Sequence, residues 1–169
     1  MLYFAYGSNL LSRRLAVRIG ACAIAGTATA AGYRLVFHKR GQDGSAKADA
    51  FGTGLDSDTV LGVLYRVTAA QKRRLDEFEG AGYRSADILI RSAQGRGQAV
   101  TYVALGHHID ANLMPFKWYR DLVIAGAYQW GFPPRYIEFL ETHATQNDPD
   151  RERQRRNMAV LRMRPADFR

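Results

Sequence analysis

The sequence predicts an α+β fold in one domain. Strand-like segments occur between residues 1 and 105, whereas residues 116 to 142 show helical periodicity. The clearest strand signal is the alternation of apolar residues over 59 to 67, which is typical of a half-buried strand. The residues expected on its buried face are Leu61, Val63, Tyr65 and Val67. With 47% hydrophobic and 24% charged residues among 169, the chain has enough apolar material for a single core.

The chain opens with a strand-to-helix turn. Residues 1 to 6 are an aromatic, strand-like run, and residues 10 to 19 repeat apolar positions every four residues, as in a helix. Between them, Gly7 permits a positive φ, and Ser8 or Asn9 can cap the helix. A helix N-terminus presents unpaired N–H groups and a positive dipole, which suit a carboxylate or phosphate. We therefore expect an anionic small molecule here, with ordinary turn chemistry as the alternative.

A second strand is expected over residues 32 to 38. The next segment, residues 39 to 54, contains four glycines together with Lys47 and Asp49. This composition predicts a long polar loop, which either borders a site as a mobile segment or is a plain surface excursion.

A capping box defines the next helix. Thr68 and Gln71 have the spacing of this motif, and Gly80 is the expected C′ glycine, so the helix should contain about eleven residues. Farther along, residues 88 to 91 and 99 to 105 predict a hairpin that turns around Gly95-Arg96-Gly97. Helices are expected from 116 to about 131 and, beginning at Pro133-Pro134, to about residue 142.

Three acids crowd the last turn of the helix that ends at Gly80. Asp76 and Glu77 have basic partners four residues earlier, which explains them as surface ion pairs. Glu79 has no such partner and lies beside the apolar face, so we expect it to be unpaired and turned inward. Burial, the negative helix end and the neighbouring carboxylates should raise its pKa, as acid/base catalysis near neutral pH requires. The alternative is a rim glutamate bonded to a backbone amide.

The composition also restricts the compartment. The single cysteine, Cys22, excludes an internal disulfide and a cysteine-based metal cluster, so we expect a cytoplasmic protein. Arg13 and Arg14 precede a run of small residues and imitate a signal peptide, but Arg18 interrupts it, and we expect no export. No stretch reaches the roughly 18 to 20 apolar residues of a membrane span, so no membrane association is expected.

The formal charge of +8 suggests nucleic-acid binding as a possibility. Residues 150 to 169 hold seven arginines and three acids, which account for half of that net charge. Residues 151 to 156 mix both signs without interleaved aromatic residues. We therefore expect a domain over residues 1–145, a solvated basic tail over 146–169, and no nucleic-acid partner.

Metal and hydrolase chemistry have little support in the sequence. The four histidines lack metal-ligand spacing; they are His38, His107, His108 and His143. Ser8 lacks the second glycine of a Gly-x-Ser-x-Gly elbow, so it is expected to be a hydrogen-bond donor rather than a nucleophile.

Two motifs resemble the gamma-glutamylcyclotransferase family, which includes gamma-glutamylamine cyclotransferases and AIG2-like proteins. They are Tyr6-Gly7-Ser8-Asn9-Leu10 and Leu75-Asp76-Glu77-Phe78-Glu79-Gly80 followed by Tyr83. A third matching stretch comprises Tyr119, Ile124-Ala125-Gly126-Ala127 and Pro133. The resemblance therefore spans roughly residues 1 to 142.

This resemblance implies a small mixed β-barrel flanked by helices, without a metal or cofactor. The family's reaction is attack of the α-amine of a γ-glutamyl group on its own γ-carbonyl, which releases 5-oxoproline and an amine. By resemblance Glu79 is the catalytic acid/base, and the loop at Gly7 holds the α-carboxylate end of the substrate. The implied substrate-binding residues are Tyr6, Gly7, Ser8, Asn9, Leu10, Tyr83 and Tyr119, with Tyr102 as a further candidate for the pocket wall.

Substrate choice is less defined. The opening Ala5-Tyr6-Gly7-Ser8-Asn9 fits the γ-glutamyl amino-acid or amine branches better than the glutathione-specific branch, which typically opens with a Gly-Tyr-Gly-Ser-Leu-like sequence. The chain departs from better-known members beyond Asn147 and in residues 39 to 54. The main functional alternative is a non-catalytic binder of small carboxylates that uses the same pocket.

Overall fold

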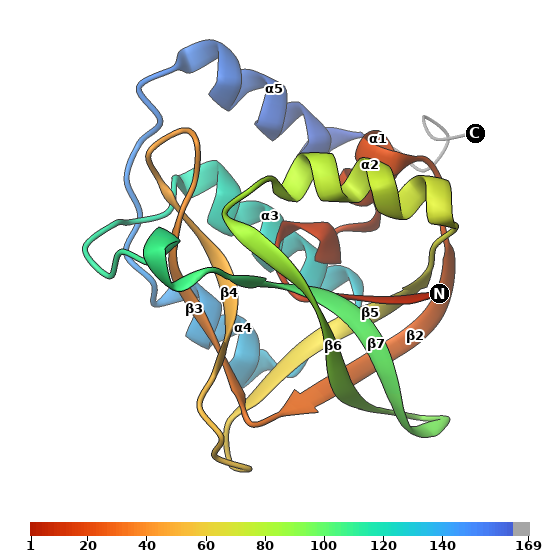
Figure 1. The fold of residues 1–169 in the computed structure, drawn as a ribbon. Coiled ribbons are helices and arrows are strands. Elements are labelled where there is room, and N and C mark those ends of the chain that lie inside the picture. The colour runs from red at the N-terminus through yellow and green to blue at the C-terminus, as the bar shows by residue number, and fades with distance from the viewer. Residues whose placement is uncertain (164–169) are drawn as a thin grey trace.

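The computed structural model describes residues 1–163 and shows a closed five-stranded barrel, a separate two-stranded sheet and five α-helices (Figure 1). The strands are β1 (Leu2–Ala5), β2 (Ala23–Ala31), β3 (Tyr33–Arg40), β4 (Ala46–Gly52), β5 (Thr59–Arg66), β6 (Tyr83–Ser92) and β7 (Gly95–Ala104). The α-helices are α1 (Ser12–Ile19), α2 (Ala69–Glu79), α3 (Lys117–Gln129), α4 (Pro134–Glu141) and α5 (Arg151–Arg162); η1 (Ser8–Leu10) and η2 (Gly106–His108) are short 3-10 helices. The expected mixed barrel flanked by helices is confirmed.

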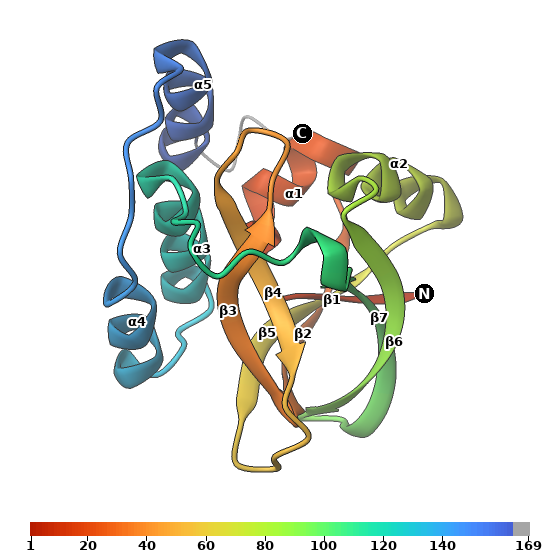
Figure 2. The same cartoon turned by 60° about the vertical axis from the view of Figure 1, so that its left-hand side comes forward.

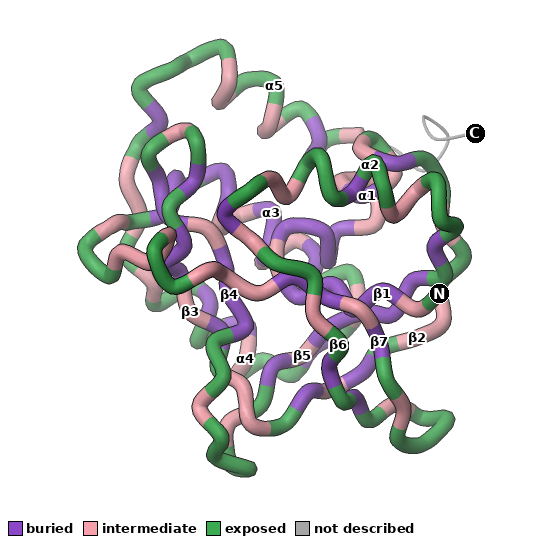
Figure 3. The backbone as a smooth tube through the Cα atoms, viewed as in Figure 1, coloured by how far each residue is buried: buried purple, intermediate pink, exposed green. Residues whose placement is uncertain are grey.

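The barrel strands follow the order β1-β5-β2-β6-β7. Adjacent strands are antiparallel, except that β1 and β7 close the barrel with a parallel contact between Tyr3 and Val100. Closure removes the free sheet edges that would otherwise pair with other chains. Phe4, Val63 and Ile88 are almost fully buried, and Figure 3 shows long buried stretches on β1 and β5.

The remaining elements form layers around this barrel. Figure 2 shows α3, α4 and α5 along one side of the molecule, with the β3–β4 sheet between them and the barrel. The helices α1 and α2 contact each other over one end of the barrel (Figure 1). This end is important because the first turn of the chain and the C-terminus of α2 meet there.

The expected loop over residues 39 to 54 is wrong. β3 continues to Arg40 and pairs with β4 from Tyr33↔Gly52 to Arg40↔Ala46, which leaves a loop of only five residues, 41–45. The buried face of β4 consists of small alanines, a residue type with weak strand propensity, and this hid the strand. The Ala/Gly-rich run that imitates a signal peptide contains β2. Its small residues also have weak strand propensity, which hid this strand as well. The pairing of β2 with β5 shifts register between Ile24 and Gly26.

Two strand predictions need smaller corrections. β5 was expected to be half-buried, but Val60 and Leu64 on its second face are buried as well, because barrel and helices cover both sides. The hairpin is present, yet its strands are longer than expected and the chain turns at Ala93 and Gln94, between β6 and β7. Gly95 has a φ of 107° and begins β7.

The opening turn also differs from the prediction. Gly7 has a φ of −99°, so it is not there for a positive φ, and neither Ser8 nor Asn9 caps α1. Both side chains are buried in η1, and Leu11 occupies the N-cap position of α1. At Gly7, close packing favours glycine: a Cβ would lie 3.3 Å from the Ala48 Cβ.

The helix predictions hold for three elements. In α2 the Thr68 side chain accepts a hydrogen bond from the Gln71 amide and the Gln71 side chain accepts one from the Thr68 amide, so the capping box is confirmed. Gly80 ends the helix with a φ of 69°. The helices α3 and α4 lie within the expected ranges, and Pro134 is in the first turn of α4.

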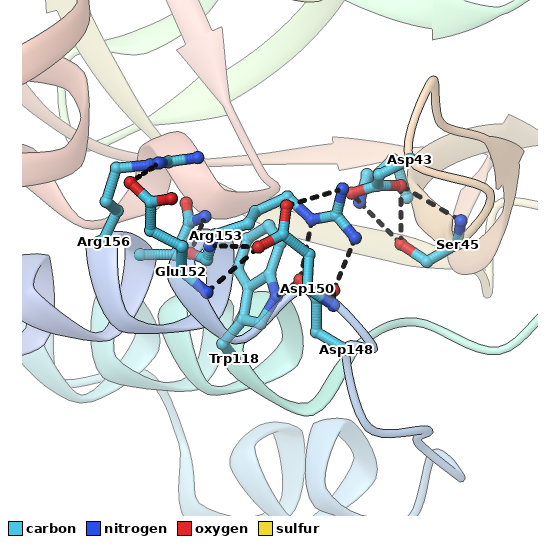
Figure 4. Close-up of polar contacts among 10 residues, drawn as sticks. Asp43, Ser45, Trp118, Asp148, Asp150, Glu152, Arg153 and Arg156 are labelled. Atoms are coloured by element: carbon cyan, nitrogen blue, oxygen red, sulfur yellow. Dashed lines mark hydrogen bonds and ion pairs between the residues drawn. The ribbon is translucent and has the colours of Figure 1, made fainter.

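Much of the predicted basic tail is helical. The N-cap of α5 is Asp150, whose carboxylate accepts hydrogen bonds from the amides of Glu152 and Arg153. The anchor of this helix is Asp148, which accepts hydrogen bonds of 2.8 Å from the Trp118 indole and from Arg153 Nε (Figure 4). Half of the twelve residues of α5 are exposed, and Val160 is buried against the rest of the molecule. Residues 164–169 of the predicted tail lie outside the described part of the chain.

We expect the attachment of α5 to weaken in acid. Hydrogen bonds from Arg153 lower the pKa of Asp148 to about 2, and its side chain is 0% exposed. A depressed pKa contributes stability above the ordinary value of about 3.9 and loses it as the pH falls toward 2. Asp148→Asn should therefore lower the free energy of unfolding by about 2 kcal/mol at neutral pH, with a gap that closes between about pH 4 and 2.

Urea unfolding of wild type and Asp148→Asn at several pH values measures this gap. Asp56→Asn, on an exposed loop, is the matched control and should show no such gap. A constant difference between wild type and Asp148→Asn at all pH values would contradict the assignment.

Candidate active site

A small cavity of about 30 Å³ lies where η1, β4, α3 and the end of α2 meet. Five tyrosines line it: Tyr3, Tyr6, Tyr83, Tyr102 and Tyr119. The other lining residues are Gly7, Ser8, Asn9, Ala48 and Glu79. We call this space the inner cavity. All the site residues expected from the sequence line this cavity except Leu10. The Leu10 side chain is fully buried in the core, and its carbonyl accepts hydrogen bonds from the Tyr65 hydroxyl and the Trp130 indole.

Glu79 faces the inner cavity from the last residue of α2. Its side chain is 16% exposed, so the expected inward orientation is correct. The expectation that it is unpaired is wrong: Oε1 accepts a hydrogen bond of 2.9 Å from Asn9 Nδ2 and lies 3.6 Å from Arg18 Nη1. These partners come from η1 and α1, so a helical pattern within α2 contains no information about them.

Asn9 connects three side chains of the site. Arg18 Nη1 donates to Asn9 Oδ1 over 2.9 Å, and Asn9 Nδ2 is also 3.0 Å from the Tyr3 hydroxyl. Because a guanidinium can only donate, Arg18 fixes the amide so that its NH₂ group is directed at Glu79. The positive charge of Arg18 thus acts on Glu79 both across space and through a polarised amide.

Burial raises the pKa of Glu79 above its ordinary value, while Arg18, the Asn9 hydrogen bond, Lys39 and Arg14 oppose this effect. A raised pKa means that this group stabilises the fold below its ordinary pKa and loses that contribution as the pH rises through the raised value. A charged Glu79 near neutral pH is therefore held at a cost in stability. Such a carboxyl is suited to accepting and returning a proton.

The tyrosine hydroxyls are held in place by polar partners. Tyr6 donates to the Tyr102 carbonyl, Tyr83 donates to the Ala48 carbonyl, and Tyr119 accepts from the Ala48 amide over 3.1 Å. Tyr102 donates to Asp76 over 2.7 Å. Burial raises the pKa of all five cavity tyrosines, that of Tyr119 to about 12. At neutral pH they are uncharged walls, and Glu79 is the one carboxylate among the cavity residues described here.

A wider space of about 300 Å³ opens beyond the inner cavity, and we call it the vestibule. The two spaces share Ser8, Glu79, Tyr83 and Tyr119. Five basic residues line the vestibule: Arg14, Arg18, Lys39, Lys47 and Arg153. The acids on its walls are Asp43, Glu77 and Glu79. Cations thus outnumber acids in the vestibule.

Several of these residues are not predicted by the sequence pattern. Arg14 and Arg18 are four residues apart in α1, beside its apolar stripe, and this spacing was the available signal. Lys39 falls in the expected loop, because the sequence predicts that the preceding strand ends at residue 38. Tyr3 was part of an aromatic strand run, in which alternation alone does not separate core from cavity.

No cluster of three or more His, Cys, Asp or Glu side chains that could hold a metal occurs among residues 1–163. Within the same residues, no helix is long and apolar enough to cross a membrane.

The family model "Gamma-glutamyl cyclotransferase, AIG2-like" matches residues 3–121. The human and mouse proteins named gamma-glutamylcyclotransferase are 27% and 28% identical to the chain over 146 residues, which cover 83% of this chain and 77% of each relative. Among solved structures, a gamma-glutamyl cyclotransferase superposes with a TM-score of 0.81 at 24% identity, covering 96% of this chain and 98% of that one. An uncharacterised human protein superposes with a TM-score of 0.76 at 27% identity, covering 86% and 88%.

The electrostatic role of Arg18 can be tested directly. Because Arg18 lowers the pKa of Glu79 against the effect of burial, Arg18→Met should raise that pKa further. Carbon-13 NMR titration of the glutamate carboxyls measures it, with Glu79→Gln to assign the signal. Arg13→Met is the matched control, since Arg13 lies on the same helix but binds the Met163 carbonyl. An unchanged or lowered pKa in Arg18→Met would refute the assigned role.

Proposed function

Because the chain belongs to the gamma-glutamyl cyclotransferase, AIG2-like family, we propose that it cleaves a γ-glutamyl amide by cyclisation and releases 5-oxoproline. The observation that carries this proposal is the largely buried Glu79, which lines both the inner cavity and the vestibule. At about 30 Å³ the inner cavity has room for only a few atoms beside Glu79, so most of a substrate must lie in the vestibule of about 300 Å³. The family suggests the type of reaction, and the position of Glu79 supports the role that we assign to it.

The reaction needs no external nucleophile. The α-amine nitrogen of the γ-glutamyl group bonds to its own γ-carbonyl carbon, and the bond from that carbon to the amide nitrogen breaks. One proton leaves the attacking amine and one joins the departing nitrogen, so 5-oxoproline and a free amine form without consuming water. Folding the substrate back on itself is favourable for catalysis, because aligned intramolecular reactions reach effective molarities of about 10⁵ to 10⁸ M.

We assign both proton transfers to Glu79. Its raised pKa supports acceptance of a proton from the attacking amine, and the same carboxyl then protonates the leaving nitrogen. Asn9 and Arg18 hold the carboxylate in one orientation and stabilise its charged form. The cavity tyrosines exclude water and define the folded shape of the substrate.

The turn from Tyr6 to Leu10 is assigned to the negative charges of the substrate. Its backbone N–H groups suit either the α-carboxylate or the oxyanion that develops on the γ-carbonyl. Ser8 adds a hydroxyl at the border of the inner cavity and the vestibule. We place the reaction in the cytoplasm, because a chain with one cysteine needs no oxidising compartment.

A non-catalytic binder of small carboxylates is the second candidate function. The cationic vestibule favours it as much as it favours an enzyme. A binder, however, gains nothing from a buried carboxyl with a raised pKa in the centre of the site. The two functions therefore differ in what the loss of the Glu79 charge should do.

We expect Glu79→Gln to lose about 10²- to 10⁴-fold in kcat, the usual range for a removed acid/base. The glutamine keeps the size of the side chain, so a γ-glutamyl ligand should still bind. The assay measures 5-oxoproline release from γ-glutamyl amino acids, γ-glutamylamines and glutathione, and calorimetry measures binding. Glu138→Gln, on the exposed side of α4, is the control and should retain wild-type turnover.

Equal turnover by wild type and Glu79→Gln would refute the catalytic assignment. Binding of γ-glutamyl compounds without 5-oxoproline release from any of them would favour the binder. Thermal unfolding of both variants verifies that any loss is not a loss of folded protein.

A further inference from the structure

Lys39 has a largely buried side chain, and its ammonium has no acidic partner among residues 1–163. The residue is 5% exposed and lines the vestibule, and within residues 1–163 its Nζ has neither a hydrogen bond nor an ion pair. Its contact is the ring of Tyr83, whose centre is 4.4 Å from Nζ. Nζ itself faces the open space of the vestibule, so the ammonium is partly desolvated, and a partly desolvated charge is normally paired with an opposite one. This position therefore suits an anion supplied from outside the chain.

The chain makes room for this lysine. A Cβ on Gly82 would lie 2.7 Å from Lys39 Nζ and 2.5 Å from its Cε, so a larger residue would displace the ammonium. Burial lowers the pKa of Lys39, whereas Glu79 and Asp43 raise it. The two carboxylates therefore favour the charged form without contacting it.

Arg14 is a second cation of this kind. Its Nε is buried and lacks a hydrogen-bond partner among the described residues. Burial lowers its pKa to about 9, which leaves it charged at neutral pH. Arg14 lies one helical turn before Arg18, so both guanidinium groups approach the vestibule from α1.

The other three cations of the vestibule are already paired. Lys47 Nζ is 2.6 Å from Asp43, Arg18 binds Asn9 beside Glu79, and Arg153 binds Asp148 (Figure 4). Within the described chain, Lys39 and Arg14 therefore remain as the vestibule cations whose charge is not matched. The imbalance lies outside the inner cavity, on the side where the leaving group of a substrate must extend.

We propose that the vestibule is a subsite for an anionic leaving group, in which Lys39 and Arg14 pair with its carboxylates. Two unmatched cations fit a leaving group with two carboxylates, so the preferred substrates are γ-glutamyl dipeptides that end in an acidic amino acid. This inference rests on the proposed function, and it selects among the substrates that function allows. γ-Glutamylamines without a carboxylate leave both cations unpaired.

The test compares three substrates: γ-glutamylglutamate, γ-glutamylalanine and the γ-glutamyl amide of n-butylamine. For wild type, kcat/KM should fall in that order as the leaving group loses carboxylates. Its preference for γ-glutamylglutamate should also weaken as salt rises, because the pairing is electrostatic and the vestibule is open to solvent.

In Lys39→Met, the ratio of kcat/KM for γ-glutamylglutamate to that for the butylamide should fall roughly 10- to 100-fold, as expected for one lost charge-assisted contact. Lys39→Arg keeps the charge and should retain most of the ratio, which guards against a variant that merely misfolds. Lys117→Met, an exposed lysine on α3 paired with Asp121, is the matched control and should keep the wild-type ratio.

Two results would overturn the inference alone: 5-oxoproline release with no preference for the acidic dipeptide, or an unchanged ratio in Lys39→Met. Release from none of the three substrates, nor from glutathione, would overturn the proposed function together with the inference. Thus failure of the subsite is distinguishable from failure of the reaction.

Discussion

The amide of Asn9 is the interaction on which the site depends. It joins Arg18 of α1 to Glu79 of α2 and reaches the hydroxyl of Tyr3 on β1. Without this amide, the carboxyl at the end of α2 would lose its hydrogen-bond donor and Arg18 its acceptor. Close packing supports the bridge: a Cβ on Gly126 of α3 would lie 2.6 Å from the Leu11 amide, so glycine lets α3 approach η1.

Local signals predicted the elements whose ends are encoded by their own residues. The Thr68 and Gln71 capping box and Gly80 defined α2, and the position of Glu79 beside an apolar face correctly indicated that it turns inward. The predictions that were wrong concern contacts between segments that are far apart in the sequence. The partners of Glu79 lie 61 to 70 positions earlier in the chain, and no periodicity within α2 reports them.

The strands built from alanine were missed for a different reason. β4 presents Ala46, Ala48 and Ala50 to the core, where small side chains let neighbouring layers come close. Alanine has weak strand propensity, so the sequence of β4 alone does not indicate a strand. The strand forms because it pairs with β3. This matters for the site, because the β3–β4 sheet places Lys39 in the vestibule and Ala48 in the inner cavity, and a loop over these residues would not predict either position.

In the reaction that we propose, the substrate's own amine, and not water, attacks the γ-carbonyl. Cleavage of γ-glutamylglutamate or γ-glutamylalanine by the full chain in ¹⁸O-labelled water, followed by mass spectrometry, tests it directly. We expect 5-oxoproline without ¹⁸O, matching 5-oxoproline incubated without protein, and no glutamate other than the free leaving group of γ-glutamylglutamate. Glutamate carrying ¹⁸O in its γ-carboxyl would show that water attacks and that the protein is a hydrolase instead.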